Sequence, residues 1–312
     1  IATTVAEATA ELAAAKAGLD PVEFRRRNLV ADDAYPTNTP SGLPLDNLSH
    51  QACLEKLLKL MNYDEKRAEQ AELRHKGIYR GIGLASFIEV TNPSPMFYGI
   101  GGAKVSAMDG CTLRVEPSGK ITCAIGVTEQ GQGTDTIIAQ VVATAVGVRM
   151  EDVRVLTGDT DTSAYGGGTW GSRGAGIGGE AAFQSGKALK QNILTVAASV
   201  LQTEADTLDM IDGVIVDKGS EVERMGLEEL ATMVQFRTHE IPNDVQPEFV
   251  VTRHFRVKGT PFVLTNGIQG AHIEVDIDTG FIKLLKHFIV EDCGTVINPQ
   301  LVDEQIRGGV VQ

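Results

Sequence analysis

Apolar positions recur at helical spacing in the first part of the chain. Asp20 stands before Pro21 as the N-cap of one helix, and Asp46 is the expected N-cap of the next. Residues 30–45 place prolines between polar residues, which is typical of a surface loop. The pattern predicts helices over four segments: 3–18, 20–28, 46–61 and 64–76.

Alternating apolar and polar residues predict strands after Gly77, with hairpin turns at Ser118-Gly119 and Thr279-Gly280. The predicted strands are 81–90, 103–108, 112–117, 121–127, 153–156, 214–219, 249–257, 271–278 and 281–290. Predicted helices follow at 133–146, at 177–201 and from Asn298-Pro299 onward. Because strands, hairpins and helices are mixed without a steady β-α-β rhythm, the fold class is α+β, with mixed sheets and packed helices. The change of pattern predicts two domains, 1–76 and 77–312.

Two glycine-dense runs, Thr128–Thr136 and Gly166–Gly174, each follow a predicted strand and precede a predicted helix. Bare backbone N–H groups at a helix N-terminus bind anions, because the helix dipole and the unpaired donors point the same way. Two such loops in one chain suggest a large phosphate-bearing cofactor. Polar side chains in both runs can donate to phosphate oxygens or to pterin edges: Gln132, Thr134, Asp135, Thr169, Ser172 and Arg173.

The residues by themselves leave several interpretations of the glycine runs and their neighbours open. The spacing matches neither GxGxxG nor GxxxxGK[ST], so dinucleotide-binding and P-loop assignments fail. Glycine runs can also be ordinary tight turns, and a surface salt bridge explains Arg173 as well as a phosphate does. Glu180 is better explained by the dipole of a helix N-terminus, and Asp159 with Asp161 by a turn, than by catalysis.

Composition excludes several classes of function. The net charge of −13, from 41 acidic and 28 basic residues, argues against nucleic-acid binding. No apolar run is long enough to predict a membrane span, and residues 1–16 do not resemble a signal peptide. The four cysteines lack the spacing of zinc or iron–sulfur sites, so no metal ligand is predicted and a reduced, cytoplasmic chain is expected. A cross-strand pairing of Cys111 with Cys123 is an open possibility.

Residues 126–140, 153–181 and 290–312 together resemble the molybdenum-binding large subunit of the xanthine dehydrogenase family. The segments AGLDPVEFRRRN (17–28) and YRGIGLASFIE (79–89) are similar to the same family and occur in the same order. Within the family, the chain looks most like carbon monoxide dehydrogenases and bacterial aldehyde or N-heterocycle hydroxylases. The resemblance covers essentially the whole chain.

The resemblance implies a molybdopterin cytosine dinucleotide held between two molybdenum-binding domains, with 1–76 the end of the first and 77–312 most of the second. It implies that Gly131, Gln132, Gly133 and Thr134 line the pterin or its pyrophosphate. It implies that Thr169 and the turn Gly171-Ser172-Arg173 support the cofactor from the other loop.

The resemblance further implies partner subunits that carry [2Fe–2S] clusters and FAD, in an oligomeric enzyme. The catalytic glutamate of the family falls in a segment beyond Gln312, so no catalytic residue is assigned and the isolated chain is expected to be inactive. A split or non-catalytic subunit that serves cofactor binding or assembly is the alternative, and a simple nucleotide-binding domain is a third reading.

Overall fold

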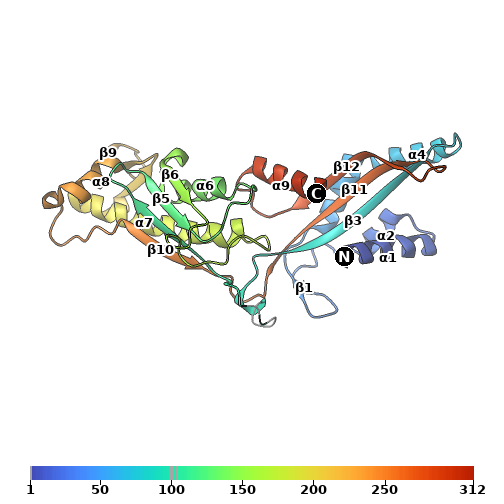
Figure 1. The fold of residues 1–312 in the computed structure, drawn as a ribbon, viewed down its shortest axis with the longest axis horizontal. Helices are drawn as coiled ribbons and strands as arrows, with labels where there is room; N and C mark the ends of the chain where they lie inside the picture. Colours follow the sequence, from blue (N-terminus) through green and yellow to red (C-terminus); the bar gives the residue numbers. More distant parts are fainter. Residues whose placement is uncertain (1, 98–101, 103) are drawn as a thin grey trace. The chain divides into compact units, whose positions relative to one another are not determined.

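The computed structural model describes residues 2–97, 102 and 104–312, which form two compact units (Figure 1). The first unit contains residues 1–90 and 264–295, and the second contains residues 91–263 and 296–312. This division differs from the predicted boundary between residues 76 and 77. The reason is strand pairing over a long sequence distance, because β3 (Tyr79–Thr91) lies beside β11 (Val263–Val275) in one sheet.

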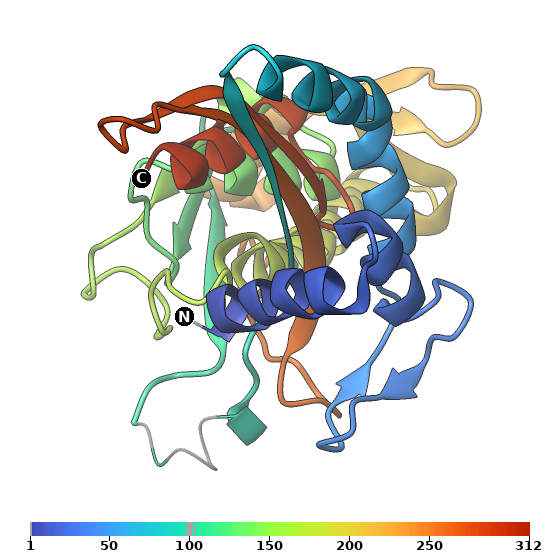
Figure 2. The same cartoon turned by 90° about the vertical axis from the view of Figure 1, so that its right-hand side faces the viewer.

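The first unit packs helices on one face of a sheet with the strand order β12-β11-β3. Figure 2 views this unit from its end. Leu54 and Leu57 of one helix meet Leu84, Ile268 and Phe288 of the strands in a buried core. The helices are α1 (Ala2–Ala17), α2 (Pro21–Asn28), α3 (His50–Met61) and α4 (Tyr63–Arg74), and β12 is Ile282–Asp292, with short strands β1 (Thr37–Asn38) and β2 (Pro44–Leu45) in the loop.

The predicted cap of α2 is confirmed, and that of α3 is wrong. Asp20 accepts the N–H of Val22 at 2.8 Å, as the sequence predicts. Asp46 lies outside α3, which begins only at His50. Its first amides are instead bound by a distant carboxylate, since Asp32 accepts the N–H groups of Gln51 and Ala52 at 3.0 and 2.9 Å. A cap supplied across a loop leaves no signal in the local sequence.

The second unit is built on a sheet with the strand order β10-β4-β5-β6, in which β4 and β5 form the predicted hairpin and β5 runs parallel to β6. Two long helices pack together on this sheet, and Gly186 allows close approach to Ala145. The strands are β4 (Asp109–Val115), β5 (Ile121–Ile125), β6 (Val153–Leu156) and β10 (Val250–Phe255), and the helices are α6 (Thr134–Val146) and α7 (Gly179–Leu201).

A smaller sheet and two further helices complete the second unit. The sheet has the order β7-β8-β9. Its strands and the helices are β7 (Leu208–Ile211), β8 (Val214–Asp217), β9 (Glu223–Gly226), α8 (Leu227–Phe236) and α9 (Pro299–Val311). Of these, the sequence predicted β8 and the start of α9 and missed β7, β9 and α8, whose short apolar runs are ambiguous between helix and strand.

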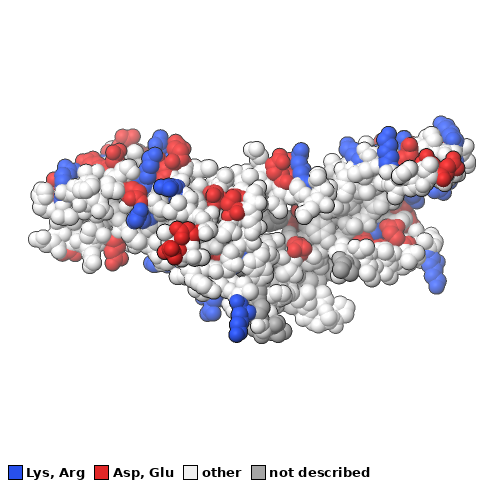
Figure 3. Space-filling view, in the orientation of Figure 1, with Lys and Arg blue, Asp and Glu red and all other residues white. Residues whose placement is uncertain are grey.

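The α+β fold class is confirmed, and one predicted strand is not. Residues 104–108 form no strand, and Ala103 lies outside the described residues. Cys111 and Cys123 are buried as free thiols with their sulfur atoms 3.5 Å apart, so they form no disulfide. No helix of the described residues is long and apolar enough to cross a membrane. On the face shown in Figure 3, acidic and basic side chains are interspersed.

Candidate functional site

The two glycine-dense runs form neighbouring loops in the second unit, the first between β5 and α6 and the second between β6 and α7. The Thr169 hydroxyl joins them, since it accepts the Thr128 N–H and donates to the Thr128 carbonyl, both at 2.8 Å. The Gln130 side-chain amide adds a bond to the Thr169 carbonyl at 2.9 Å. The structure therefore brings together two segments that lie about forty residues apart, and with them all the predicted site residues.

In the first loop, a carboxylate of the chain itself occupies the backbone N–H groups that the sequence left open for an anion. Glu129 Oε1 accepts the N–H groups of Gln130, Gly131 and Gly133 at 3.0, 2.7 and 3.0 Å. Its Oε2 accepts the Asp135 N–H at 3.0 Å, in the first turn of α6. We call these four donors the amide nest. The nest therefore holds a negative charge that the chain itself supplies, whereas the predicted external anion stays a prediction.

The polar side chains predicted to face a ligand are engaged inside the first loop. Gln132 donates through Nε2 to the Thr134 hydroxyl at 2.8 Å and to the Thr128 carbonyl at 3.3 Å, and its Oε1 accepts the Gln130 N–H at 2.7 Å. Thr134 is buried. Gln132 and Thr134 therefore hold the loop in shape. Gly131 is exposed, so its backbone lies on the surface of the loop.

The second loop is built around a buried ion pair. Arg173 and Asp109 are both 0% exposed, and Arg173 Nη2 lies 3.1 Å from Asp109 Oδ2. Arg173 also donates to the carbonyls of Met108 and Gly168 at 2.9 and 3.2 Å. Asp109 was absent from the predicted site, because a single aspartate before a strand carries no distinctive pattern.

Glycines surround this pair because the charged groups leave no room for side chains. A Cβ at Gly126 or Gly166 would collide with the Asp109 carboxylate, and a Cβ at Gly167 would collide with the Arg173 guanidinium. The glycine density of the second run thus has a packing reason that is independent of any ligand. Gly168 and Gly171 differ, since both have positive φ and a Cβ at Gly168 would meet nothing within 4 Å.

The exposed part of the second loop is the turn from Trp170 to Ser172. Trp170 is 36% exposed, its ring nitrogen donates to the Gly167 carbonyl at 3.0 Å, and its ring lies 5.9 Å from the Arg173 guanidinium. Ser172 is exposed and has φ of 51°, a conformation that few non-glycine residues adopt. Strained residues of this kind cluster at binding and catalytic sites.

The charges of the two loops shift the pKa values of three carboxyl groups. Burial raises the pKa of Glu129, but the four nest amides lower it by more and leave it below its ordinary value. Burial and the neighbouring Glu129 charge raise the pKa of Asp135. Burial also raises the pKa of Asp109, against the opposing effects of Arg173 and of backbone N–H donors. Only in the first loop does one carboxylate, that of Glu129, raise the pKa of a neighbouring carboxyl group, that of Asp135.

The tail helix α9 adds a wall to the first loop. Its N-cap, Asn298, accepts the Leu301 N–H at 3.1 Å and donates to the Gln140 side chain at 2.8 Å. A Cβ at Gly133 would collide with the Leu301 side chain. The predicted role of Asn298-Pro299 as a helix start is confirmed, and the contact explains why Gly133 must be glycine, besides its φ of 84°.

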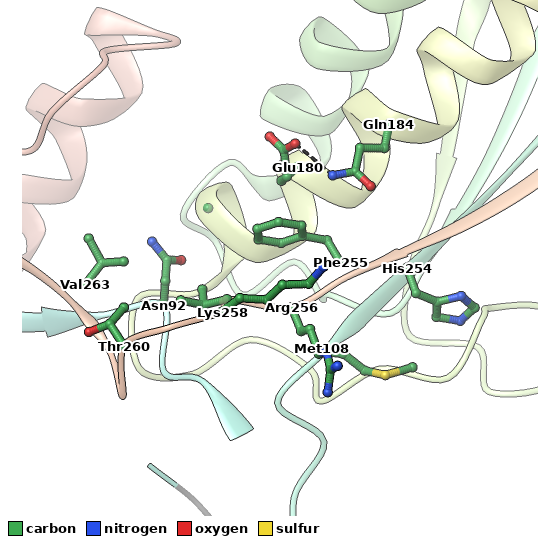
Figure 4. A pocket seen from close by; sticks show the side chains of 12 residues that line it. Asn92, Met108, Glu180, Gln184, His254, Phe255, Arg256, Lys258, Thr260 and Val263 are labelled. Atoms are coloured by element: carbon green, nitrogen blue, oxygen red, sulfur yellow. Dashed lines mark hydrogen bonds between the residues drawn. The ribbon is translucent and has the colours of Figure 1, made fainter. Parts of the chain in front are cut away.

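An open cleft of about 750 Å³ lies in the same unit, next to the segment that follows the second loop (Figure 4). Glu180 and Gln184 of α7 line it and are joined by a hydrogen bond of 2.9 Å. Phe255, Arg256 and Lys258, at and beyond the end of β10, line it from another side. The described residues contain no group of three or more His, Cys, Asp or Glu placed to hold a metal ion.

Comparisons with known proteins give the same family for almost the whole chain. The model of the molybdopterin cofactor-binding domain matches residues 56–312. The nicotine 6-hydroxylase large subunit of Paenarthrobacter nicotinovorans is 33% identical over 299 residues, covering 96% of this chain and 36% of that protein. The carbon monoxide dehydrogenase large chain of Hydrogenophaga pseudoflava is 30% identical over 311 residues, covering 98% of this chain and 38% of that protein.

A solved structure extends the likeness to three dimensions. Quinoline 2-oxidoreductase from Pseudomonas putida 86 superposes with a TM-score of 0.89 at 30% identity, over 99% of this chain and 39% of that chain. The chain thus spans well under half the length of the relatives it matches.

Proposed function

The chain belongs to the molybdopterin cofactor-binding domain family, and on that premise we propose that its two glycine loops form one wall of a molybdopterin dinucleotide site. The observation that carries the proposal is the double hydrogen bond between Thr128 and Thr169, which holds both loops on one surface. Residues 1–76 and 77–312 belong, in this proposal, to the first and the second molybdenum-binding domain.

The residues present fit the hydrogen-bonding part of such a cofactor. Gly131 and Gly168 have positive φ, and a Cβ at either position would point into open space, so a flat ring can approach the backbone there. The exposed Ser172 hydroxyl and the backbone at Gly171 offer polar groups beside that space. Gln132, Gly133, Thr134 and Thr169 support the proposal by holding this surface in shape.

The fit for the charge of the cofactor is poorer. Arg173 was a candidate partner for a phosphate, with a surface salt bridge as the alternative, and it is fully buried against Asp109. Its role in the proposal is therefore to fix the second loop. In the proposal, the turn at Ser172, just before Arg173, contacts the cofactor in place of the Arg173 side chain.

The molybdenum centre, when bound, supplies a two-electron acceptor for oxidising a carbon atom with oxygen derived from water. We propose that the whole protein is a molybdenum hydroxylase that oxidises an aldehyde, an N-heterocycle or carbon monoxide. In the same proposal the cofactor is the cytosine dinucleotide form, and cytoplasmic partner subunits carry [2Fe–2S] clusters and FAD in an oligomer. In this proposal the residues of this chain bind and orient the cofactor.

The alternative is a cofactor-binding or assembly module without turnover. Both proposals require the same bound group, so the first test is identification of that group. Denaturation of the purified protein and mass spectrometry of the released small molecules should yield cytidine monophosphate and a pterin derivative, with molybdenum found by elemental analysis. A simple nucleotide without a pterin would refute both.

Catalytic turnover distinguishes the hydroxylase from the assembly module. The protein carrying this chain, assembled with its partner subunits, should reduce an artificial electron acceptor when given an aldehyde, an N-heterocycle or carbon monoxide. A loaded complex that reduces the acceptor with none of the three would favour the assembly module.

A further inference from the structure

The first glycine loop is organised around the Glu129 carboxylate. All four donors of the amide nest, in Gln130, Gly131, Gly133 and Asp135, lie within 3.0 Å of its two oxygen atoms. The nest includes the first turn of α6, where the helix dipole favours a negative charge. A phosphate oxygen at this place would need the same four N–H groups.

The surrounding charges do not allow a second anion beside Glu129. Asp135 follows within the same turn, and burial together with the Glu129 charge raises the pKa of its carboxyl. The nearest guanidinium in the second loop, that of Arg173, is paired with Asp109. A phosphate placed next to the nest would therefore meet two carboxylates of the chain and no uncommitted arginine of these loops.

The shape of the loop depends on the same carboxylate. Gly131 and Gly133 have φ of 99° and 84°, and each donates its N–H to Glu129. The Gln132 side chain closes the other side of the loop onto Thr134. Without the carboxylate, the positive-φ residues would lose the bonds that select their conformation, because glycine populates many others.

We propose that Glu129 is the positioning residue of the first glycine loop. Its carboxylate takes the place of an external anion in the amide nest and holds the loop in its ligand-binding shape. The exposed side of the loop is thereby left to contact an uncharged part of the cofactor. The identity of that cofactor rests on the proposed function, whereas the role of Glu129 in closing the nest rests on these contacts alone.

The test uses the protein that carries this chain in four forms: wild type, Glu129→Ala, Glu129→Gln and, as a matched control, Glu228→Ala. Glu228 is an exposed glutamate in the first turn of α8, so its removal changes helix-dipole electrostatics without opening a nest. Thermal unfolding of each form is followed by circular dichroism. Each form is titrated with sodium formate and with inorganic phosphate, with sodium chloride as the ionic-strength control.

Glu129→Ala should unfold at a lower temperature than wild type, and formate should restore at least half of that loss by entering the vacated nest. Wild type and Glu228→Ala should gain nothing from formate or phosphate beyond the chloride effect. Glu129→Gln, whose NH₂ group faces N–H donors, should be destabilised as well. If wild type gains stability from phosphate or formate beyond the chloride effect, the nest is open to external anions and the proposal is wrong, a result that needs no folded variant.

Cofactor content separates this proposal from the proposed function. Wild type without a pterin nucleotide would refute the proposed function and leave the nest to be judged by the formate titration. Wild type with the nucleotide, and Glu129→Gln with equal content and equal stability, would refute the positioning role. The expected result is a loaded wild type and a several-fold lower content in Glu129→Gln, with Glu228→Ala at the wild-type level.

Discussion

Breaking the buried ion pair between Asp109 and Arg173 should strongly destabilise the second unit. The substitution Arg173→Met keeps most of the side-chain volume and removes the charge. It leaves the Asp109 carboxylate buried at 0% exposure, and it leaves the Met108 and Gly168 carbonyls without their donor. Removing one partner of a buried pair costs about 3–5 kcal/mol, because the remaining charge has no compensation.

Thermal unfolding followed by circular dichroism measures this loss. For a unit of this size, a loss of about 3 kcal/mol lowers the midpoint by roughly 6–12 °C. The matched control is Arg149→Met, which breaks a surface pair with Asp152 where the arginine is 55% exposed. Exposed pairs contribute about 0–1 kcal/mol.

A double-mutant cycle completes the test. Asp109→Asn should be destabilising alone, and the double variant Asp109→Asn/Arg173→Met should lose less than the sum of the two single losses, because the cycle removes both charges. Additive losses, or an Arg173→Met midpoint no lower than that of Arg149→Met, would refute the idea that the second loop is built around this pair.

Three further outcomes are expected. Gly167→Ala should lower the free energy of unfolding by about 1–3 kcal/mol, because the added Cβ collides with the Arg173 guanidinium. Gly83→Ala, where a Cβ meets nothing within 4 Å, should change it little. Equal effects of the two substitutions in chemical denaturation would contradict the packing argument. Because the folded-state pKa of Glu129 is depressed, its stabilisation is present above the ordinary value of 4.5 and is lost as pH falls through the folded pKa. The difference in free energy of unfolding between wild type and Glu129→Gln should therefore shrink on acidification. A difference that stays constant in denaturant titrations from neutral pH to about pH 3 would contradict a stabilising role of the Glu129 carboxylate. Asp32→Ala should lower the free energy of unfolding by about 0.5–2 kcal/mol, because the first amides of α3 lose their acceptor. Asp33→Ala, at the next exposed position, should leave it nearly unchanged in the same chemical denaturation. An Asp32→Ala variant as stable as wild type would show that the cap contributes nothing.

Local patterns in the sequence were sufficient for many of the elements and for locating the two glycine runs. The stripe that ends at Met61, the Gly147 that ends α6, the hairpin at Ser118-Gly119 and the capping of α2 by Asp20 all depend on residues a few positions apart. The two glycine runs could be found in the same way, since glycine is required wherever φ is positive or a Cβ would collide. The family could be recognised from those motifs and their order.

The partners of the loop residues were decided only by the tertiary structure. The sequence left Arg173 open to a phosphate or to a surface salt bridge, and in the structure it is paired and buried with Asp109, which lies more than sixty residues earlier in the chain. Strand β3 groups with the first compact unit because its neighbour, β11, comes more than 170 residues later in the chain. These contacts pair groups distant in sequence, and nothing in either local segment specifies them.

The sequence by itself determined that this chain presents two small-residue loops at helix N-termini where negative charge is favoured. The tertiary structure decided which negative charge is there, namely the Glu129 carboxylate in one loop and the buried Asp109 beside Arg173 in the other. The physical reason is that a backbone N–H group binds any negative group of suitable geometry, whether that group belongs to the chain or to a ligand. Only the folded chain brings its own carboxylates close enough to supply it.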